Sequence, residues 1–199
     1  MGVRINALTA TTTPADTDVM PIDTSAGTRK VTWANIKATL KTYLDTLYLP
    51  TVFWVRDEKS SGTAAQSLSA ATWNKRTLAS KLNTISGASI ASSVVTLPAG
   101  TYEATAFAVT SNQTTDSIQH KIRLYDTTNT AELVVGSSAH LSTGNTSLTQ
   151  STIPMARFTL AGTTNIELQH YVSAANPGGK ATSSGSVEVY AEAYFKKVA

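Results

Sequence analysis

Two histidines occupy the apolar faces of predicted strands, where an imidazole side chain is unexpected. Between Ile118 and Tyr125, apolar and polar residues alternate with a period of two, and His120 falls on the apolar face. His170 holds a similar position in the run 166–172. A metal site or a proton-linked site would require the two imidazoles to converge, for example on an oligomer axis. The commoner alternative is a buried or interface side chain that hydrogen-bonds to the backbone.

No other cluster of reactive residues has the spacing of a known site. Asp16, Asp18 and Asp23 lie near one another, but without the central glycine and closing glutamate of a calcium loop, so turn and cap hydrogen bonds explain them better. No Gly-x-Ser-x-Gly motif occurs, and the glycines at 178–179 lack the strand and helix of a phosphate-binding loop. No pair of acidic residues is distinctively spaced for glycoside hydrolysis. The sequence predicts no catalytic residue, metal ligand or cofactor, and therefore a protein that is not an enzyme.

The charge balance argues against nucleic acid as a partner. The chain of 199 residues has 16 basic and 13 acidic residues, and the basic residues are scattered instead of forming a stripe with aromatic residues. Cysteine is absent, which excludes disulfides and thiolate metal sites. No apolar run has the length of a signal-peptide core or a transmembrane span, which predicts a protein made in a cytoplasm without membrane insertion.

The chain divides into three predicted zones, 1–31, 32–50 and 51–199. In the first zone, short arms at 18–23 and 28–32 flank the turn residues 24–27, which predicts a small hairpin. Because this zone has little apolar area, we expect it to order against another protein.

The second zone, 32–50, is the one convincing helix of the sequence. Thr32 can cap its start, and Pro50 ends it. Its apolar residues recur at alternating spacings of three and four, the rhythm of a coiled-coil seam. These residues are Trp33, Ile36, Leu40, Tyr43 and Leu47. We expect the stripe to pair with copies of the same chain or, alternatively, to pack on the chain's own sheet. Aromatic residues occur at both the a and the d positions of the heptad, so the pattern does not distinguish a three-stranded from a two-stranded coiled coil.

The third zone, 51–199, changes to a period of two and contains about eight to ten short apolar runs separated by turn residues. This pattern predicts a mainly β fold, in which a jelly-roll β-sandwich head follows the helix and a mostly extended N-terminal segment. Both faces of the last strand, 187–195, carry apolar residues, which is typical of a strand covered on both sides. Strict alternation puts Tyr190 and Tyr194 on the same face of that strand. We therefore predict self-association of the head, with His120, His170, Tyr190 and Tyr194 at the interface.

Three N-terminal segments recur together in one class of protein. They are 5–8 (Ile-Asn-Ala-Leu), 14–22 (Pro-Ala-Asp-Thr-Asp-Val-Met-Pro-Ile) and 29–36 (Arg-Lys-Val-Thr-Trp-Ala-Asn-Ile). This region resembles the start of many tailed-bacteriophage fibre and appendage proteins, in which it leads into a helix and forms the virion-attachment end. The resemblance implies that residues 1–31 bind another virion structural protein. The apolar side chains expected to anchor it are Ile5, Leu8, Val19, Met20 and Ile22.

The β zone carries further strand-and-turn signatures at 73–78, 97–102, 120–126 and 161–168. They are similar to the trimeric fibre heads of the same phage proteins, which have a tumour-necrosis-factor or C1q-like jelly roll. The resemblance implies a short tail or collar fibre: a homotrimer in the virion, synthesised in the host bacterial cytoplasm. Its helices would form a trimeric coiled coil, and its head would bind a glycan or protein of the host surface.

Two alternatives stay open on the sequence. The chain could be a purely structural collar or baseplate fibre, or a connector, without receptor binding. It could also be a polysaccharide depolymerase, although no residue pattern supports this. If the head binds a receptor, the polar loops 111–117, 137–150 and 173–186 are the expected contacts, and three copies would add avidity.

Overall fold

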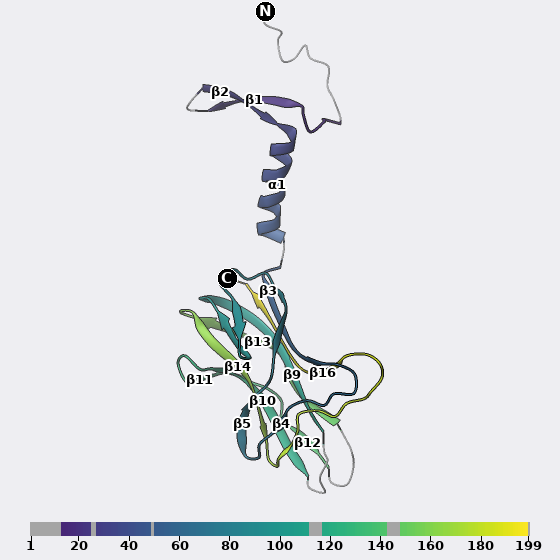
Figure 1. Ribbon diagram of the computed structural model, residues 1–199. Coiled ribbons are helices and arrows are strands. Elements are labelled where there is room, and N and C mark those ends of the chain that lie inside the picture. The colour runs from purple at the N-terminus through teal and green to yellow at the C-terminus, as the bar shows by residue number, and fades with distance from the viewer. Residues whose placement is uncertain (1–12, 25–26, 49, 112–116, 143–147, 199) are drawn as a thin grey trace, which may run out of the picture. The chain divides into compact units, whose positions relative to one another are not determined.

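The computed structural model describes residues 13–24, 27–48, 50–111, 117–142 and 148–198 (Figure 1). The chain forms two compact units, Met1–Leu49 and Pro50–Ala199. Each unit has its own secondary structure, and each is described below by itself.

The first unit is a hairpin followed by a helix, as the sequence predicts. Strands β1 (Val19–Thr24) and β2 (Gly27–Thr32) pair antiparallel, and helix α1 spans Trp33–Tyr48. The backbone N–H of Asn35 donates to Thr32 Oγ1 at 3.2 Å, which confirms Thr32 as the N-cap. The helix is too short and too polar to cross a membrane, and the described residues contain no other helix.

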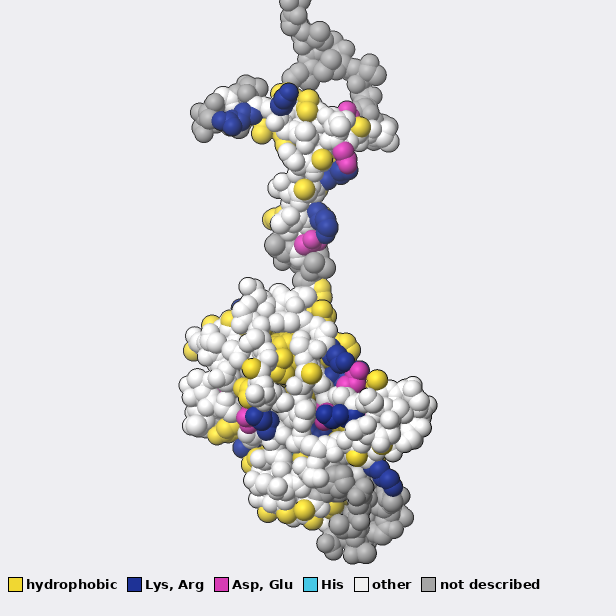
Figure 2. Space-filling view, viewed as in Figure 1, with side chains coloured by type: hydrophobic (Ala, Val, Ile, Leu, Met, Phe, Trp, Pro, Cys, Tyr) yellow, Lys and Arg dark blue, Asp and Glu magenta, His cyan; other side chains and the backbone are white. Residues whose placement is uncertain are grey.

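The described residues of this first unit form no buried core. Every residue of 13–45 whose exposure is described is half-buried or exposed. Leu40 and Leu44 on α1 are 53% and 41% exposed, and Figure 2 shows apolar side chains at the surface of the helix and the hairpin. The ion pair between Lys41 and Asp45 lies in solvent and adds little stability. A hairpin and a single helix of this kind are marginal in water unless their apolar side chains are covered.

The second unit is a sandwich of two antiparallel sheets. We call them the β9 sheet, with strand order β13-β9-β16-β3-β6, and the β10 sheet, with order β11-β10-β14-β8-β7; β12 also pairs with β10, and β5 with β14. The first four strands named in each sheet have the strand order of a jelly roll, with β3, β9, β13 and β16 in one sheet and β8, β10, β11 and β14 in the other. The predicted fold class, a mainly β protein with a jelly-roll sandwich and one short helix, is therefore confirmed.

The strands of the β9 sheet are β3 (Val52–Lys59), β6 (Ala79–Asn83), β9 (Gly100–Ser111), β13 (Leu148–Leu160) and β16 (Glu188–Lys197). The strands of the β10 sheet are β5 (Thr72–Lys75), β7 (Ser89–Ala91), β8 (Val94–Leu97), β10 (Ile118–Asp126), β11 (Ala131–Val135), β12 (Ala139–Leu141) and β14 (Thr164–Val172). Two short strands, β4 (Ser67–Leu68) and β15 (Asn176–Pro177), pair with each other.

The core lies between the two sheets and consists of the inward side chains of both. Phe53, Tyr102 and Phe195 come from the β9 sheet, and Ile122 and Leu168 come from the β10 sheet; all five are at most 1% exposed. The predicted alternation in 118–125 is also present, because its even-numbered residues face this core and its odd-numbered residues face outward.

A bulge in β16 overturns the predicted position of Tyr190. The pairing of β16 with β3 shifts register between Val189 and Ala191, so strict alternation fails at this point. Tyr190 is only 2% exposed, and its hydroxyl donates to the carbonyl oxygen of Thr63 at 2.8 Å. Its ring lies so close to Gly179 that a Cβ there would meet it at 2.1 Å. Tyr190 is therefore an internal residue of one protomer, and its prediction as an interface residue is wrong.

Candidate functional site

The two unexpected histidines meet inside a single protomer. His120 Nδ1 and His170 Nε2 are 2.9 Å apart, and His120 Nε2 is 2.7 Å from Thr149 Oγ1 on β13. Both histidines are at most 2% exposed, so neither can reach another protomer in this conformation. The prediction that they lie on apolar strand faces is confirmed, and their prediction as interface residues is wrong.

The hydrogen bonds of this pair select one set of tautomers. Among the described residues, His170 Nδ1 has no hydrogen-bond partner. If His170 Nε2–H donates to His120 Nδ1, then His120 Nε2–H donates to Thr149, and only a lone pair on His170 is left unpaired. The opposite tautomers would bury an unpaired N–H donor, which costs more. In this arrangement of neutral rings, the pair links β10 and β14 of one sheet to Thr149 on β13 of the other.

Burial explains why the pair stays neutral. It lowers the pKa of His120 to about 4. Burial also lowers the pKa of His170, and the positive charge of Arg76 and the neighbouring His120 lower it further. No group of three histidine or acidic side chains in the described part of the chain could hold a metal ion.

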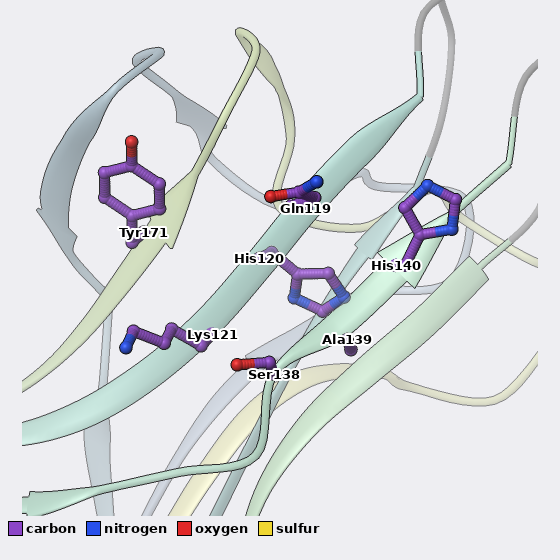
Figure 3. A pocket seen from close by; sticks show the side chains of 7 residues that line it. All are labelled: Gln119, His120, Lys121, Ser138, Ala139, His140 and Tyr171. Atoms are coloured by element: carbon purple, nitrogen blue, oxygen red, sulfur yellow. The ribbon is translucent and has the colours of Figure 1, made fainter.

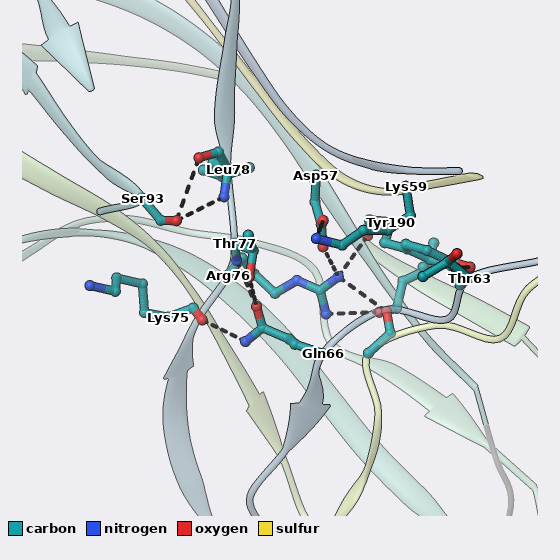
Figure 4. Close-up of polar contacts among 12 residues, drawn as sticks. Asp57, Lys59, Thr63, Gln66, Lys75, Arg76, Thr77, Leu78, Ser93 and Tyr190 are labelled. Atoms are coloured by element: carbon teal, nitrogen blue, oxygen red, sulfur yellow. Dashed lines mark hydrogen bonds and ion pairs between the residues drawn. The ribbon is translucent and has the colours of Figure 1, made fainter. Parts of the chain in front are cut away.

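A buried ion pair lies in the same interior. Arg76, which follows β5, and Asp57 on β3 both have fully buried side chains, with Arg76 Nη2 3.3 Å from Asp57 Oδ2 (Figure 4). The same Nη2 group lies 3.1 Å from the carbonyl oxygen of Gly178 and 3.2 Å from that of Tyr190. Burial lowers the pKa of Arg76 to about 10, against the opposing effect of Asp57, so the guanidinium remains charged at neutral pH. This cation links β5, β3, β16 and the loop before β16.

A concave site of the sandwich lies on the outer face of the β10 sheet. It is a pocket of about 540 Å³ between β10, β12 and β14 (Figure 3). It is lined by Gln119, His120, Lys121, Ser138, Ala139, His140 and Tyr171. Its volume lies within the usual range for small-molecule sites.

Strand register assembles this surface from three distant segments. Lys121 on β10 pairs with Tyr171 on β14, and Tyr171 pairs with Trp73 on β5. Directly opposed residues of antiparallel strands share a face, so these three side chains form one row across the sheet. Gln119 likewise pairs with His140 on β12 at the other side of the pocket.

A stacked arginine fixes the aromatic part of the row. The guanidinium carbon of Arg123 lies 4.0 Å from the ring centre of Trp73 and 4.2 Å from that of Tyr125. Its Nε–H donates to Gln169 Oε1 at 2.9 Å. Trp73 in turn lies against Tyr171 in a tilted arrangement, with ring centres 5.7 Å apart. Tyr171 is therefore a supported wall of the pocket.

The charges on this face are unevenly paired. Arg123 lies 3.3 Å from Glu132, and Lys75 lies 3.7 Å from Glu167. Lys121, which lines the pocket, forms no ion pair with any described residue. Among the described residues that line the pocket, Lys121 is thus a positive charge without an acidic partner.

The remaining predicted residues lie at the surface or outside the described part. Ile36, Leu40 and Tyr43 line one apolar groove with the hairpin, and Trp33 is half-buried at the start of α1. The side chain of Leu47 and all of Ile5 and Leu8 lie outside the described residues.

The other predicted anchoring side chains and one head residue are accessible. Val19, Met20 and Ile22 on the hairpin are 52%, 46% and 41% exposed. Tyr194 is half-buried on the outer face of the β9 sheet, next to the largely exposed Met155. Their roles in binding stay predictions.

Sequence reasoning missed the row of Lys121, Tyr171 and Trp73. The alternation in 118–125 identifies Lys121 as outward-facing, which is the one available signal. Nothing local pairs it with residues about 50 positions away on either side. Arg76 was missed as well, because arginine is almost never fully buried unless it is paired, and its partner Asp57 comes from another strand.

Among solved structures, crystal structures of murine APRIL resemble the chain. The structure at pH 5.0 has a TM-score of 0.46 and 11% identity, and the match covers 75% of this chain and 99% of the APRIL chain. The structure at pH 8.5 has a TM-score of 0.48 with the same identity and coverage. No protein-family model and no curated protein sequence matches the chain. The likeness concerns the fold alone, and the jelly-roll assignment rests on the strand order given above.

Proposed function

We propose that the chain is a structural appendage protein of a tailed-bacteriophage virion, assembled as a homotrimer. Residues 1–31 bind another virion protein, α1 forms a short three-stranded coiled coil, and the β head binds the surface of the host cell. The phage assignment rests on the resemblance of segments 5–8, 14–22 and 29–36 to such proteins.

The observation that carries the trimer is that the described residues of the first unit form no buried core. Leu40 and Leu44 stay largely exposed on a helix whose apolar residues follow a three-four spacing. That spacing suits a coiled-coil seam, and copies of the same chain supply a matching seam without any further partner. Burying the stripe would also stabilise a helix that is marginal by itself.

The outer face of the β9 sheet favours assembly of the heads. Trp54, Phe107 and Tyr194 are half-buried there, and none of the described sheets packs on this face. Met155 and Leu82 on the same sheet are 73% and 46% exposed. Apolar side chains gathered on one face are typical of a protein–protein interface. Of the four head residues that the sequence predicts at the interface, Tyr194 is the one that the proposal keeps there.

Light scattering tests the trimer and the role of the helix. We expect the full-length protein at micromolar concentration to have three times the mass of one chain. Replacing Ile36 and Leu40 with Asp puts six carboxylates into the seam of a trimer and should strongly weaken assembly. The matched control is Ala38→Asp, an exposed helix position off the stripe, which should leave the mass unchanged. A monomeric wild-type protein contradicts the proposal; an intact trimer of the double variant leaves the helix as a linker only.

Binding to whole bacteria separates a receptor-binding head from a plain connector. The labelled full-length protein is incubated with a panel of bacterial strains. We expect retention on some strains and not others, because three weak contacts per trimer add up to avid binding only where the receptor is present. Equal retention on all strains, or on none, would favour the connector.

A further inference from the structure

We propose that the pocket between β10, β12 and β14 binds a saccharide that carries a carboxylate group. This inference deepens the host-binding part of the proposed function, on which it rests for the biological source of the saccharide. It is carried by three features of the pocket: a supported aromatic wall, a set of free polar side chains, and one uncompensated positive charge.

The aromatic wall suits the apolar face of a sugar ring. A pyranose has C–H groups on its faces and hydroxyls around its edge, so it needs a flat apolar surface beside polar groups. Tyr171 lines the pocket, and Trp73 packs against it from the neighbouring strand, with ring centres 5.7 Å apart. Because Arg123 is held between Trp73 and Tyr125, this wall loses little conformational entropy when a ligand binds.

The polar side chains suit the hydroxyl edge. Gln119 on β10, His140 on β12 and Ser138 before β12 line the pocket together (Figure 3). Among the described residues, none of these three side chains takes part in a hydrogen bond, so their donors and acceptors remain for a ligand. An amide, a hydroxyl and an imidazole match the mixed donor and acceptor character of sugar hydroxyls.

The charge pattern selects an acidic saccharide over a neutral one and over a polyanion. Arg123 and Lys75 are paired with Glu132 and Glu167, whereas Lys121 has no acidic partner among the described residues. The site therefore offers one positive charge, which a single carboxylate would complement. A nucleic acid would need several such charges along a stripe, and the neighbouring glutamates would repel it.

The test uses the full-length protein and a panel of oligosaccharides that contain hexuronic or nonulosonic acids. Each acidic oligosaccharide is paired with its carboxyl-reduced, neutral counterpart, and binding is measured by calorimetry and ligand-observed NMR. We expect at least one acidic member to bind, with its neutral counterpart about tenfold weaker, which corresponds to about 1.4 kcal/mol. Lys121→Gln should remove this preference, and Tyr171→Leu should weaken both forms. Lys180→Gln removes the same charge from an exposed loop and should change nothing.

Each result decides the proposal. It is overturned if no acidic saccharide binds the wild-type protein, if neutral counterparts bind equally well, or if Lys121→Gln binds like Lys180→Gln. Trimer mass and thermal midpoint are measured for every variant; if Tyr171→Leu fails to fold, the Lys121→Gln comparison still decides. Strain-selective cell binding that survives in both pocket variants overturns this inference but leaves the proposed function standing. Saccharide binding without any strain-selective cell binding would support this inference and contradict the host-binding part of the proposed function.

Discussion

Replacing Arg76 with Met is expected to lower the free energy of unfolding by about 3–5 kcal/mol, the usual cost of removing one partner of a buried ion pair. Asp57 would remain fully buried, with only the partly exposed Lys59 left as an ionic partner, 3.4 Å from Oδ1. The carbonyl oxygens of Gly178 and Tyr190 would lose the guanidinium that lies 3.1 and 3.2 Å away. The loss should appear as a lower urea midpoint at fixed chain concentration, because the stability of an oligomer depends on concentration.

The matched control removes both charges. Arg76→Met combined with Asp57→Leu leaves no unpaired charge, so we expect it to recover most of the stability lost in the single variant. Lys59 Nζ, 3.4 Å from Asp57 Oδ1, has a partly exposed side chain and can turn to solvent in this double variant. Equal destabilisation by the single and the double change would mean that lost packing, and not the loss of the buried cation beside Asp57, dominates.

Acidification from pH 6 to pH 5 is expected to destabilise the protein through the histidine pair. Burial lowers the pKa of His120 to about 4 in the folded chain and that of His170 as well, against about 6.5 in an unfolded chain. Between the lowered pKa of each folded-state histidine and about 6.5, the unfolded chain binds protons that the folded chain does not. Stability is thus fully present above pH 6.5 and falls toward pH 4, by up to about 1.4 kcal/mol per pH unit for each histidine.

The measurement is the urea midpoint at several pH values between 7 and 5. This window avoids carboxylates such as Glu188, whose pKa is lowered by the backbone N–H groups of Thr182, Ser183 and Gly62 and whose contribution is lost only at lower pH. His170→Gln should reduce the slope by about half, while His140→Gln, at an exposed position, should leave it unchanged. If stability is flat across the window, or if both variants keep the full slope, the pair does not control acid sensitivity.

The sequence by itself determined the features that depend on near neighbours in the chain. The helix over Trp33–Tyr48 follows from a cap, a stripe and a terminating proline within 19 residues of sequence, 32–50. The hairpin follows from turn residues between two short arms, and the inward and outward faces of 118–125 follow from period-two alternation. About eight to ten predicted strands, separated by turn residues, also favoured a jelly roll, because few sheet topologies connect that many short antiparallel strands.

Only the tertiary structure decided which strand faces meet. One bulge, between Val189 and Ala191, turned Tyr190 from a predicted surface residue into a core residue, and no local pattern marks it. The pairing of β10 with β14 joined His120 to His170 on the inner face and Lys121 to Tyr171 on the outer face. The physical reason is that alternation fixes only the side of a strand on which a residue lies. The register between distant strands is fixed by the best packing of the whole core, and sites that need two strands exist only once that register is set.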